Sequence, residues 1–448
     1  MNRRLLLIEA RRSLGLWALL ALPIWFWLNR TLPQVAPFWF ETSLIVRNTT
    51  GAIGPILGGA AAWMAGRESR RGLHDLLATT PQPQLMRRLT TLLGATVWGL
   101  LGYLLVGVVI LAFGWSRATW GSPFFGPILV GLVALPVYAA LGFAIGRRFP
   151  GRFAAPLVAI GLLVVPVIVG ESRDSRAFLS PLVSLSHSVW YGIGPDLTVL
   201  QLAFLFCLGA VAIATLALPA RKRWQTALGC LLLLALLAVP VSVVWMIAPT
   251  RGGQELSTDP RYRSLELLPY IPVCKEAPMP VCVHPAYQGS LAETTASLNR
   301  LVAPILGLPG APIRAEQGYA AVQGKDDLQG GTLWFDLYQQ GASANHPTLP
   351  AFAVFGAVRE PRSTMANCPA SDSTDSSECL LAQAVIGRWL LRQAGVADAG
   401  TLSPPAQEGR VGPAVDRFAA LDPATQRAWL EAHFADLRAG RVTLGEML

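Results

Sequence analysis

The chain has 448 residues, of which 52% are hydrophobic and only 14% are charged, whereas soluble domains carry roughly a quarter charged residues. Residues 1–248 hold 20 Lys/Arg against 7 Asp/Glu, a balance of +13, while residues 249–448 hold 16 against 20, a balance of −4. This distribution excludes a nucleic-acid-binding protein, because no basic face outside the apolar half is rich enough to follow phosphates. It predicts a basic membrane half followed by a mildly acidic water-soluble half.

The first residues combine basic and apolar side chains. Arginines 3, 4, 11 and 12 surround the apolar run from Leu5 to Ile8, which predicts an interfacial amphipathic helix over residues 1–13 at the inner membrane surface. A cleaved secretory signal is the competing interpretation. It is rejected because no small-x-small cleavage site follows Leu28, and because bulky Trp25, Phe26 and Trp27 crowd that position.

Charge-free stretches predict seven membrane-spanning helices, because nearly all reach the ~18 to 20 residues that cross a hydrocarbon core of about 30 Å. Six of them form a transmembrane domain over residues 14–220, and a seventh helix covers residues 224–250. The stretches are Ser13 to Leu28, Asn48 to Gly66, Leu89 to Ser116, Ala118 to Gly146, Phe153 to Gly170, Leu197 to Ala220 and Trp224 to Thr250.

The basic residues near the ends of the spans predict the orientation. With the N-terminus in the cytoplasm, fifteen Lys/Arg side chains of the short loops fall inside and five fall outside, namely Arg30, Arg47, Arg117, Arg173 and Arg176. Positive charge concentrates on the cytoplasmic side of membrane proteins. An odd number of spans then places residues 251–448 outside the cytoplasm. The scarcity of lysine in an Ala/Gly/Pro/Leu-rich background indicates a high-GC bacterium, and hence a multi-pass protein of a bacterial cell membrane.

Residues 177–195 form one further uncharged stretch, but its Pro, Ser, His and Gly residues make it too polar and too broken to span. Counting it as a span would also move Arg221, Lys222 and Arg223 to the outside, so it is interpreted as a helical hairpin or re-entrant element at the outer face. Within the spans, Gly54 with Gly58 and Gly142 with Gly146 have small-x3-small spacing, which permits close helix crossings. The spacing is compatible with packing inside one chain or with dimerisation.

The tail, residues 251–448, mixes the periodicities of helices and strands. Leucines and other apolar residues between Leu291 and Leu306 recur at helical spacing, and so do those of 380–393 and 424–437. Residues 332–338 and 351–358 alternate or run apolar in the manner of strands. The expected fold is a compact α+β domain that can bury its own core.

The six cysteines fit this topology. Cys207 and Cys230 lie in predicted spans and are interpreted as small packing residues. The tail holds two close pairs, Cys274 with Cys282 and Cys368 with Cys379, for which two local disulfides are expected in an oxidising compartment. A four-cysteine metal site is the alternative, but the spacings lack the C-x2-C element of zinc sites.

The loop at residues 67–88, between the second and third spans, carries the most informative pattern. Leu73, Leu76 and Leu77 form one apolar stripe on a short predicted helix that ends at Thr80 and Pro81. Such a helix, with a basic flank, suits a groove on a soluble partner. An interfacial helix that covers lipid headgroups is an equally good interpretation from the residues alone.

The chain here resembles the permeases of type-2 ABC exporters. In that family the second span leads into a cytoplasmic loop with a pattern like E-x-x-x-G-T-L-E-x-L-L-x-T-P, whose helix docks on the ATP-binding subunit. In the corresponding loop this chain has Glu68, then Gly72, Leu73, Leu76, Leu77, Thr80 and Pro81. The resemblance covers about 220 residues: the interfacial helix, six spans and the outer re-entrant element. It departs from the family where Thr-Leu-Glu is replaced by Leu73-His74-Asp75, and in having a seventh span and a large external domain.

Catalytic motifs are missing from the sequence. The only Gly-Lys pair, Gly324 with Lys325, is followed by Asp326, so there is no P-loop and ATP hydrolysis would belong to a partner. The five histidines are scattered without H-E-x-x-H, and His284 is interpreted as a structural group beside a disulfide. No G-x-S-x-G nucleophile elbow occurs, and the serines around His187 are interpreted as small polar residues of the re-entrant element.

The expected function is therefore that of a membrane permease subunit in an ATP-driven export system. The expected partners are a cytoplasmic ABC ATPase, a second permease subunit in a homodimer or heterodimer, and membrane lipids; no cofactor is expected. A membrane-anchored sensor or assembly protein with an extracytoplasmic ligand-binding domain is the alternative. A membrane-tethered hydrolase is a third hypothesis, which the missing nucleophile and metal motifs disfavour.

Overall fold

The computed structural model describes residues 8–11, 13, 38–72, 83–172, 175–183, 190–217, 266–318, 331–335, 337, 349–359, 378–396 and 408–447. The chain divides into two compact units, residues 1–268 and 269–448. The first unit is helical, and the second combines helices with a small sheet. The soluble tail, predicted to begin at residue 251, thus corresponds to a compact unit that begins at Pro269.

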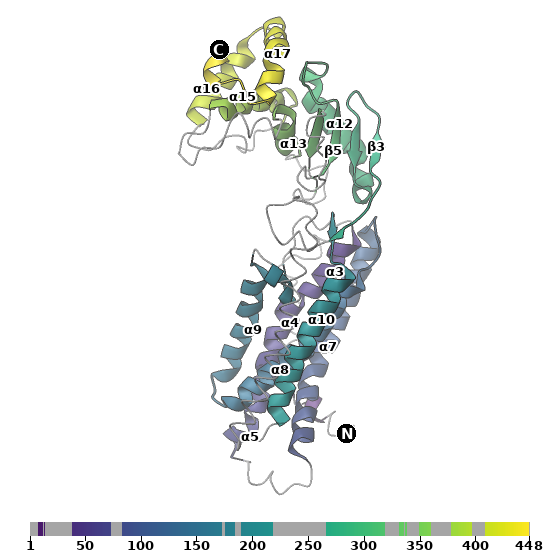
Figure 1. The fold of residues 1–448 in the computed structure, drawn as a ribbon, viewed down its shortest axis with the longest axis vertical. Helices are drawn as coiled ribbons and strands as arrows, with labels where there is room; N and C mark the ends of the chain where they lie inside the picture. Colours follow the sequence, from purple (N-terminus) through teal and green to yellow (C-terminus); the bar gives the residue numbers. More distant parts are fainter. Residues whose placement is uncertain are drawn as a thin grey trace. The chain divides into compact units, whose positions relative to one another are not determined.

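The first unit is a bundle of long helices that run side by side (Figure 1). Helix α8 contacts α3, α4, α7, α9 and α10, so it occupies the centre of the bundle. The core joins α4, α7 and α8 through buried side chains such as Leu57, Tyr103 and Leu135. The helices of this unit are α3 (Trp39–Asn48), α4 (Thr50–Ala65), α5 (Arg67–Arg70), α7 (Gln84–Arg117), α8 (Phe125–Arg148), α9 (Ala154–Gly170) and α10 (Pro195–Ala217).

Three helices in the described part of the chain are long and apolar enough to cross a membrane: α7, α8 and residues 195–216 of α10. This is fewer than the seven predicted spans. Helix α9 is apolar but has only 17 residues, and the second predicted span, Asn48 to Gly66, corresponds to α4, which has 16 residues. The predicted first span, apart from Ser13, and the seventh, residues 224–250, lie outside the described residues. A membrane protein is supported, and the count of seven stays a prediction.

Helices α4 and α8 approach each other along a seam of small residues. A Cβ atom at Gly142 would lie 2.1 Å from the carbonyl oxygen of Gly58, and one at Gly146 would lie 2.3 Å from that of Ala62. Gly54 faces the ring of Tyr138 in the same way, at 2.9 Å. Both predicted small-x3-small pairs therefore pack against helices of the same chain. Of the two interpretations, packing inside one chain is the one that the structure supports for these glycines.

Two predicted peripheral elements are partly described. Residues 8–11 are helical and pack on α7, where the indole nitrogen of Trp98 donates to the carbonyl of Ala10 at 2.7 Å. In the predicted re-entrant element, the described residues form the short 3-10 helix η2 (Ser175–Leu179) and the strand β1 (Tyr191–Gly192). Strand β1 pairs antiparallel with β2 (Glu266–Leu267). The sequence predicted either a helical hairpin or a re-entrant element here. The described part of this segment contains a 3-10 helix and a short strand.

The second unit contains a four-stranded mixed sheet in the order β3-β4-β5-β6. The antiparallel hairpin β3–β4 pairs Cys274 with Cys282, while β4, β5 and β6 are parallel. Helix α12 (Leu291–Val302) connects β4 to β5, which is the crossover that a parallel pair requires. The strands are β3 (Val273–Lys275), β4 (Val281–Val283), β5 (Arg314–Gln317) and β6 (Thr332–Phe335).

The remaining helices of this unit are α13 (Leu349–Val358), α15 (Glu378–Gln393), α16 (Glu408–Ala420) and α17 (Pro423–Arg438). The expected helices near 291–306, 380–393 and 424–437 and the strand near 332 are confirmed. The strand expected at residues 351–358 is wrong, because this segment is α13. A short apolar run has no periodicity that separates a buried strand from a buried helix, and here the run packs its helix against β6 and α15.

Candidate functional site

The loop after α4 is fixed at its base by ion pairs. Glu68 of α5 contacts Arg87 of α7 at 3.1 Å, across the nineteen residues that include the loop. The neighbouring Arg67 contacts Glu9 of the N-terminal helical segment at 3.0 Å. Helix α5 is thus attached to the N-terminal segment through Arg67 and to α7 through Glu68.

A third contact at this end of α4 involves Arg70. Its guanidinium donates to the carbonyl of Trp63 at 2.6 Å and lies 4.0 Å from the centre of the Trp63 ring. Gly72 follows with φ +65°, a left-handed conformation that glycine adopts without strain. The helical conformation of α5 therefore does not continue through Gly72.

The structure places only two of the seven predicted partner-binding residues. Glu68 lies in α5, and Gly72 lies two residues after the end of this helix. Leu73, Leu76, Leu77, Thr80 and Pro81 lie outside the described residues, so the apolar stripe stays a prediction.

Two further arginines connect the ends of the long helices beside this loop. Arg88 of α7 and Arg147 of α8 both donate to the carbonyl of Leu216, at 2.6 and 3.0 Å. Leu216 precedes Ala217, the last described residue of α10. Three helices are therefore joined through a single carbonyl oxygen.

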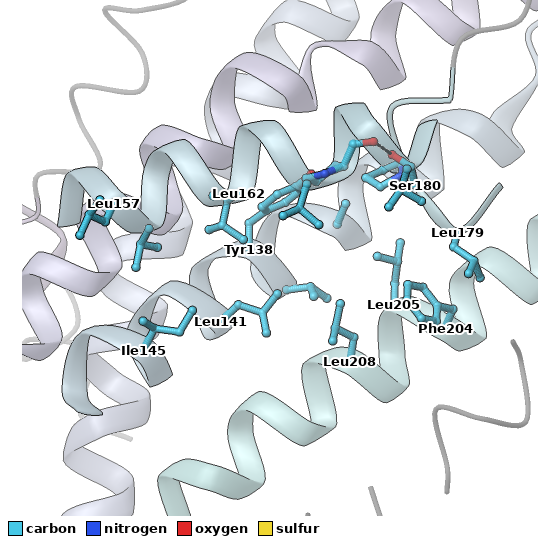
Figure 2. Close-up of a pocket in the computed structure, with 18 of the residues that line it drawn as sticks. Tyr138, Leu141, Ile145, Leu157, Leu162, Leu179, Ser180, Phe204, Leu205 and Leu208 are labelled. Carbon is cyan, nitrogen blue, oxygen red and sulfur yellow. Dashed lines mark hydrogen bonds between the residues drawn. The ribbon is translucent and has the colours of Figure 1, made fainter. Parts of the chain in front are cut away.

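An apolar cavity lies between α8, α9 and α10 (Figure 2). Its volume is about 590 Å³, which is within the range of small-molecule sites. Side chains of all three helices point toward the same space, including Leu141 of α8, Leu162 of α9 and Leu205 of α10. Leu179, Ser180 and Pro181 close one end.

The segment that closes this cavity is held by hydrogen bonds to its backbone and side chains. The hydroxyl of Ser180 donates to the carbonyl of Pro166 in α9 at 2.7 Å. Gln201 of α10 donates to the carbonyl of Phe178 at 2.7 Å, and Arg47 of α3 donates to that of Val183 at 2.8 Å. Residues 178–183 are therefore attached to three different helices.

Arg47 is a residue that the sequence analysis misplaced, because it was counted among the charges of an outer loop. Its side chain is fully buried, and its Nε and Nη1 atoms have no hydrogen-bond partner among the described residues. The signal in the sequence was the mostly apolar segment Phe38–Val46, interrupted by Glu41, which precedes this charge and the second predicted span. Buried ionisable groups in membrane helices often have functional roles.

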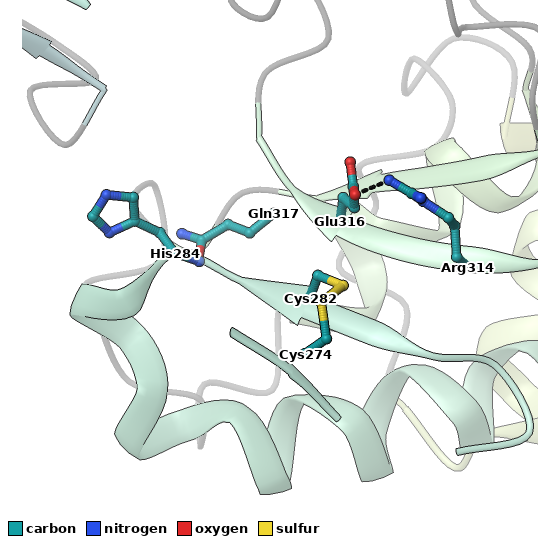
Figure 3. The surroundings of a disulfide bond; sticks show 6 residues. All are labelled: Cys274, Cys282, His284, Arg314, Glu316 and Gln317. Carbon is teal, nitrogen blue, oxygen red and sulfur yellow. Dashed lines mark hydrogen bonds and ion pairs between the residues drawn. A yellow bond between two sulfur atoms is a disulfide. The ribbon is translucent and has the colours of Figure 1, made fainter. Parts of the chain in front are cut away.

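In the second unit, the predicted disulfide between Cys274 and Cys282 is confirmed and joins β3 to β4 (Figure 3). Cys379, the second residue of α15, is also disulfide-bonded, but Cys368 lies outside the described residues, so that pairing stays a prediction. Cys207 is a free thiol within α10, as expected.

His284 follows β4 directly and is fully buried. Its Nδ1 atom accepts from the amide of Ala286 at 3.1 Å, and its own amide donates to the Oε1 atom of Gln317 at 3.0 Å. Figure 3 shows the side chain of Gln317 directed toward His284, while Glu316 pairs with Arg314. The ring of Tyr270 lies 4.5 Å from that of His284, centroid to centroid. His284 therefore caps a turn and connects two strands, which agrees with the structural interpretation.

Burial lowers the pKa of His284 to about 4, compared with about 6.5 in an unfolded chain. Between these values the unfolded chain binds more protons, so stability is lost as the pH falls from 6.5 toward 4. We expect the second unit to lose about 1 to 2 kcal/mol between pH 7 and pH 5 from this group. Proteolytic susceptibility in urea at the two pH values measures the loss. His284→Gln should flatten the dependence, whereas His433→Gln, at an exposed position, should not.

Comparison of the chain with known protein families, with curated proteins and with solved structures finds no match. The assignment of a function therefore depends on the residues and geometry described above.

Proposed function

We propose that the chain is the membrane-spanning permease subunit of an ATP-driven ABC export system, which couples to a separate cytoplasmic ATPase through the loop at residues 67–88. Two permease subunits, identical or different, would form the translocation path. The N-terminus would be cytoplasmic and the tail extracytoplasmic. The arginine bias of the loops and the disulfide between Cys274 and Cys282 support this topology.

The observation that carries the proposal is the fixed base of the loop. When a soluble partner displaces a loop helix, the movement reaches the membrane helices only if the ends of the loop helix are attached rigidly to them. Glu68 supplies one attachment through Arg87 of α7, and Arg67 supplies another through Glu9. Arg88, next to Arg87, continues the connection to the end of α10. A displacement of the loop would thus reach α4, α7 and α10 together.

The first test concerns the predicted stripe. Replacing Leu76 and Leu77 together with Asp would place two unpaired charges in an ATPase groove, which costs more than the ~1.5 to 3 kcal/mol of each lost leucine contact. We expect the double variant to insert in the membrane but to lose co-purification with a candidate ABC ATPase.

The matched control for this test is the pair His74→Asp and Ala78→Asp, which puts two charges on the same predicted helix but off the stripe. This control should retain the ATPase. Full retention by the Leu76 and Leu77 variant would instead favour the membrane-anchored sensor, in which the loop binds no ATPase.

Glu68 should behave differently from the stripe. Because it orients the base of the loop through Arg87 and does not belong to the stripe, Glu68→Ala should weaken ATP-driven transport while the ATPase still co-purifies. Exchanging the charges, with Glu68→Arg and Arg87→Glu together, should restore part of the transport that either single replacement removes. Equal transport by Glu68→Ala and the unmodified protein would contradict a coupling role for this ion pair.

A further inference from the structure

The cavity between α8, α9 and α10 extends along most of the length of α9. Its lining begins at Phe149 and Ala154 and continues to Val169. The fifteen helical steps from Ala154 to Val169 correspond to about 22 Å at 1.5 Å per residue. A single leaflet contributes about 15 Å of a ~30 Å hydrocarbon core. The cavity is therefore a groove long enough for an extended acyl chain.

The chemistry of the lining restricts what the groove can hold. Of its twenty lining residues, only Tyr138 and Ser180 carry polar side chains, and the Ser180 hydroxyl is already hydrogen-bonded to the carbonyl of Pro166. Leu157 and Val165 line the groove and are also 66% and 60% exposed, so the groove opens toward the apolar surroundings of α9. Sugars and nucleotides would lose hydrogen bonds there, whereas an acyl chain would lose none.

Positive charge is concentrated at the Phe149 end of the groove. Residues 147–154 contain three arginines and no acidic residue. Arg147 is occupied by the carbonyl of Leu216. Arg148 and Arg152 are exposed, and neither forms an ion pair with any described residue. Phe149 and Phe153, 64% and 78% exposed, alternate with these arginines as aromatic side chains do at the level of lipid headgroups.

We infer that this groove binds one anionic phospholipid of the surrounding bilayer, with an acyl chain between α8, α9 and α10 and the phosphate at Arg148 and Arg152. Guanidinium groups bind phosphate oxygens through paired hydrogen bonds, and basic pockets between membrane helices bind anionic headgroups. The inference goes beyond the proposed export function and does not require an ATPase.

The headgroup is tested with the full-length chain in bilayer discs that contain equal amounts of phosphatidylglycerol and phosphatidylcholine. After transfer to detergent, native mass spectrometry counts the lipids retained. We expect a preference for phosphatidylglycerol that falls about fivefold for each of Arg148→Gln and Arg152→Gln. Arg71→Gln removes an exposed arginine from a different segment, outside residues 147–154, and should leave the preference unchanged. Equal retention of both lipids by the unmodified chain would overturn the inference.

The acyl chain is tested with Gly161, which lines the groove and whose added Cβ would meet no atom within 4 Å. Gly161→Phe should fill the groove from inside α9 without a backbone clash, and should lower retained phosphatidylglycerol at least fivefold. Ile160→Phe adds an aromatic ring to the same helix at a position that is 57% exposed and outside the lining, and should retain the lipid. Size-exclusion profiles establish that both variants are folded. Equal lipid retention by the two folded variants would exclude the groove as the binding site.

Discussion

Gly142→Leu should strongly destabilise the packing of the membrane bundle. Even the first carbon of the new side chain would lie 2.1 Å from the carbonyl oxygen of Gly58 and 2.8 Å from its Cα atom. These are backbone atoms of α4 and cannot rotate away, so the two helices would have to separate. Because α4 and α8 form the most extensive helix contact of the unit, the separation would open the core around Leu57 and Leu135.

Overpacking ordinarily costs about 1 to 3 kcal/mol, and the position of Gly142 places it at or above the upper value. For a unit of this size, this corresponds to a fall of roughly 6 to 12 °C in the midpoint of thermal unfolding. Thermal unfolding of the purified chain in detergent measures it. Gly161→Leu is the matched control, since it introduces the same side chain into a helix where a Cβ meets open space. An equal midpoint for the two variants would show that the seam tolerates separation.

The sequence predicted the elements whose signal is local. Charge-free stretches located α7, α8, α9 and α10 to within a few residues, because exclusion of charge is a property of each stretch alone. The amphipathic spacing of α12 and the short interval between Cys274 and Cys282 are local in the same sense. These local signals predicted the α+β class of the second unit. Helix α16 was not predicted, and it has Pro413 inside it.

What the sequence could not predict depends on partners distant along the chain. Arg47 is buried because its guanidinium reaches the carbonyl of Val183, 136 residues away. The residues 351–358 became a helix through their packing on β6 and α15, although their composition fits a buried strand equally well. The groove exists only where three helices meet, and no motif identifies it. Glu68 was singled out from a motif, but its contact with Arg87 required the structure.

A buried arginine of the second unit offers a comparison with Arg47, because its hydrogen bonds are more numerous. Arg438, at the end of α17, is 7% exposed. Its Nη1 atom donates to the carbonyl of Gly310 at 2.5 Å, and its Nη2 atom donates to those of Gly356 and Arg359 at 3.3 and 3.5 Å. The last two carbonyls belong to the C-terminal end of α13, where unpaired acceptors and the helix dipole favour a cation.

Arg438→Met should therefore destabilise the second unit by about 2 to 4 kcal/mol, because it preserves most of the side-chain length but leaves buried carbonyl groups without this donor, at about 1 to 3 kcal/mol for each unsatisfied group. Amide hydrogen exchange of the full-length chain should accelerate in α13 and α17 and stay unchanged in α7, α8 and α10. Arg441→Met is the control: Arg441 is exposed and contacts Asp436 at 2.5 Å, and exposed ion pairs contribute little. Similar exchange in the two variants would mean that the buried hydrogen bonds of Arg438 add no more stability than a surface ion pair.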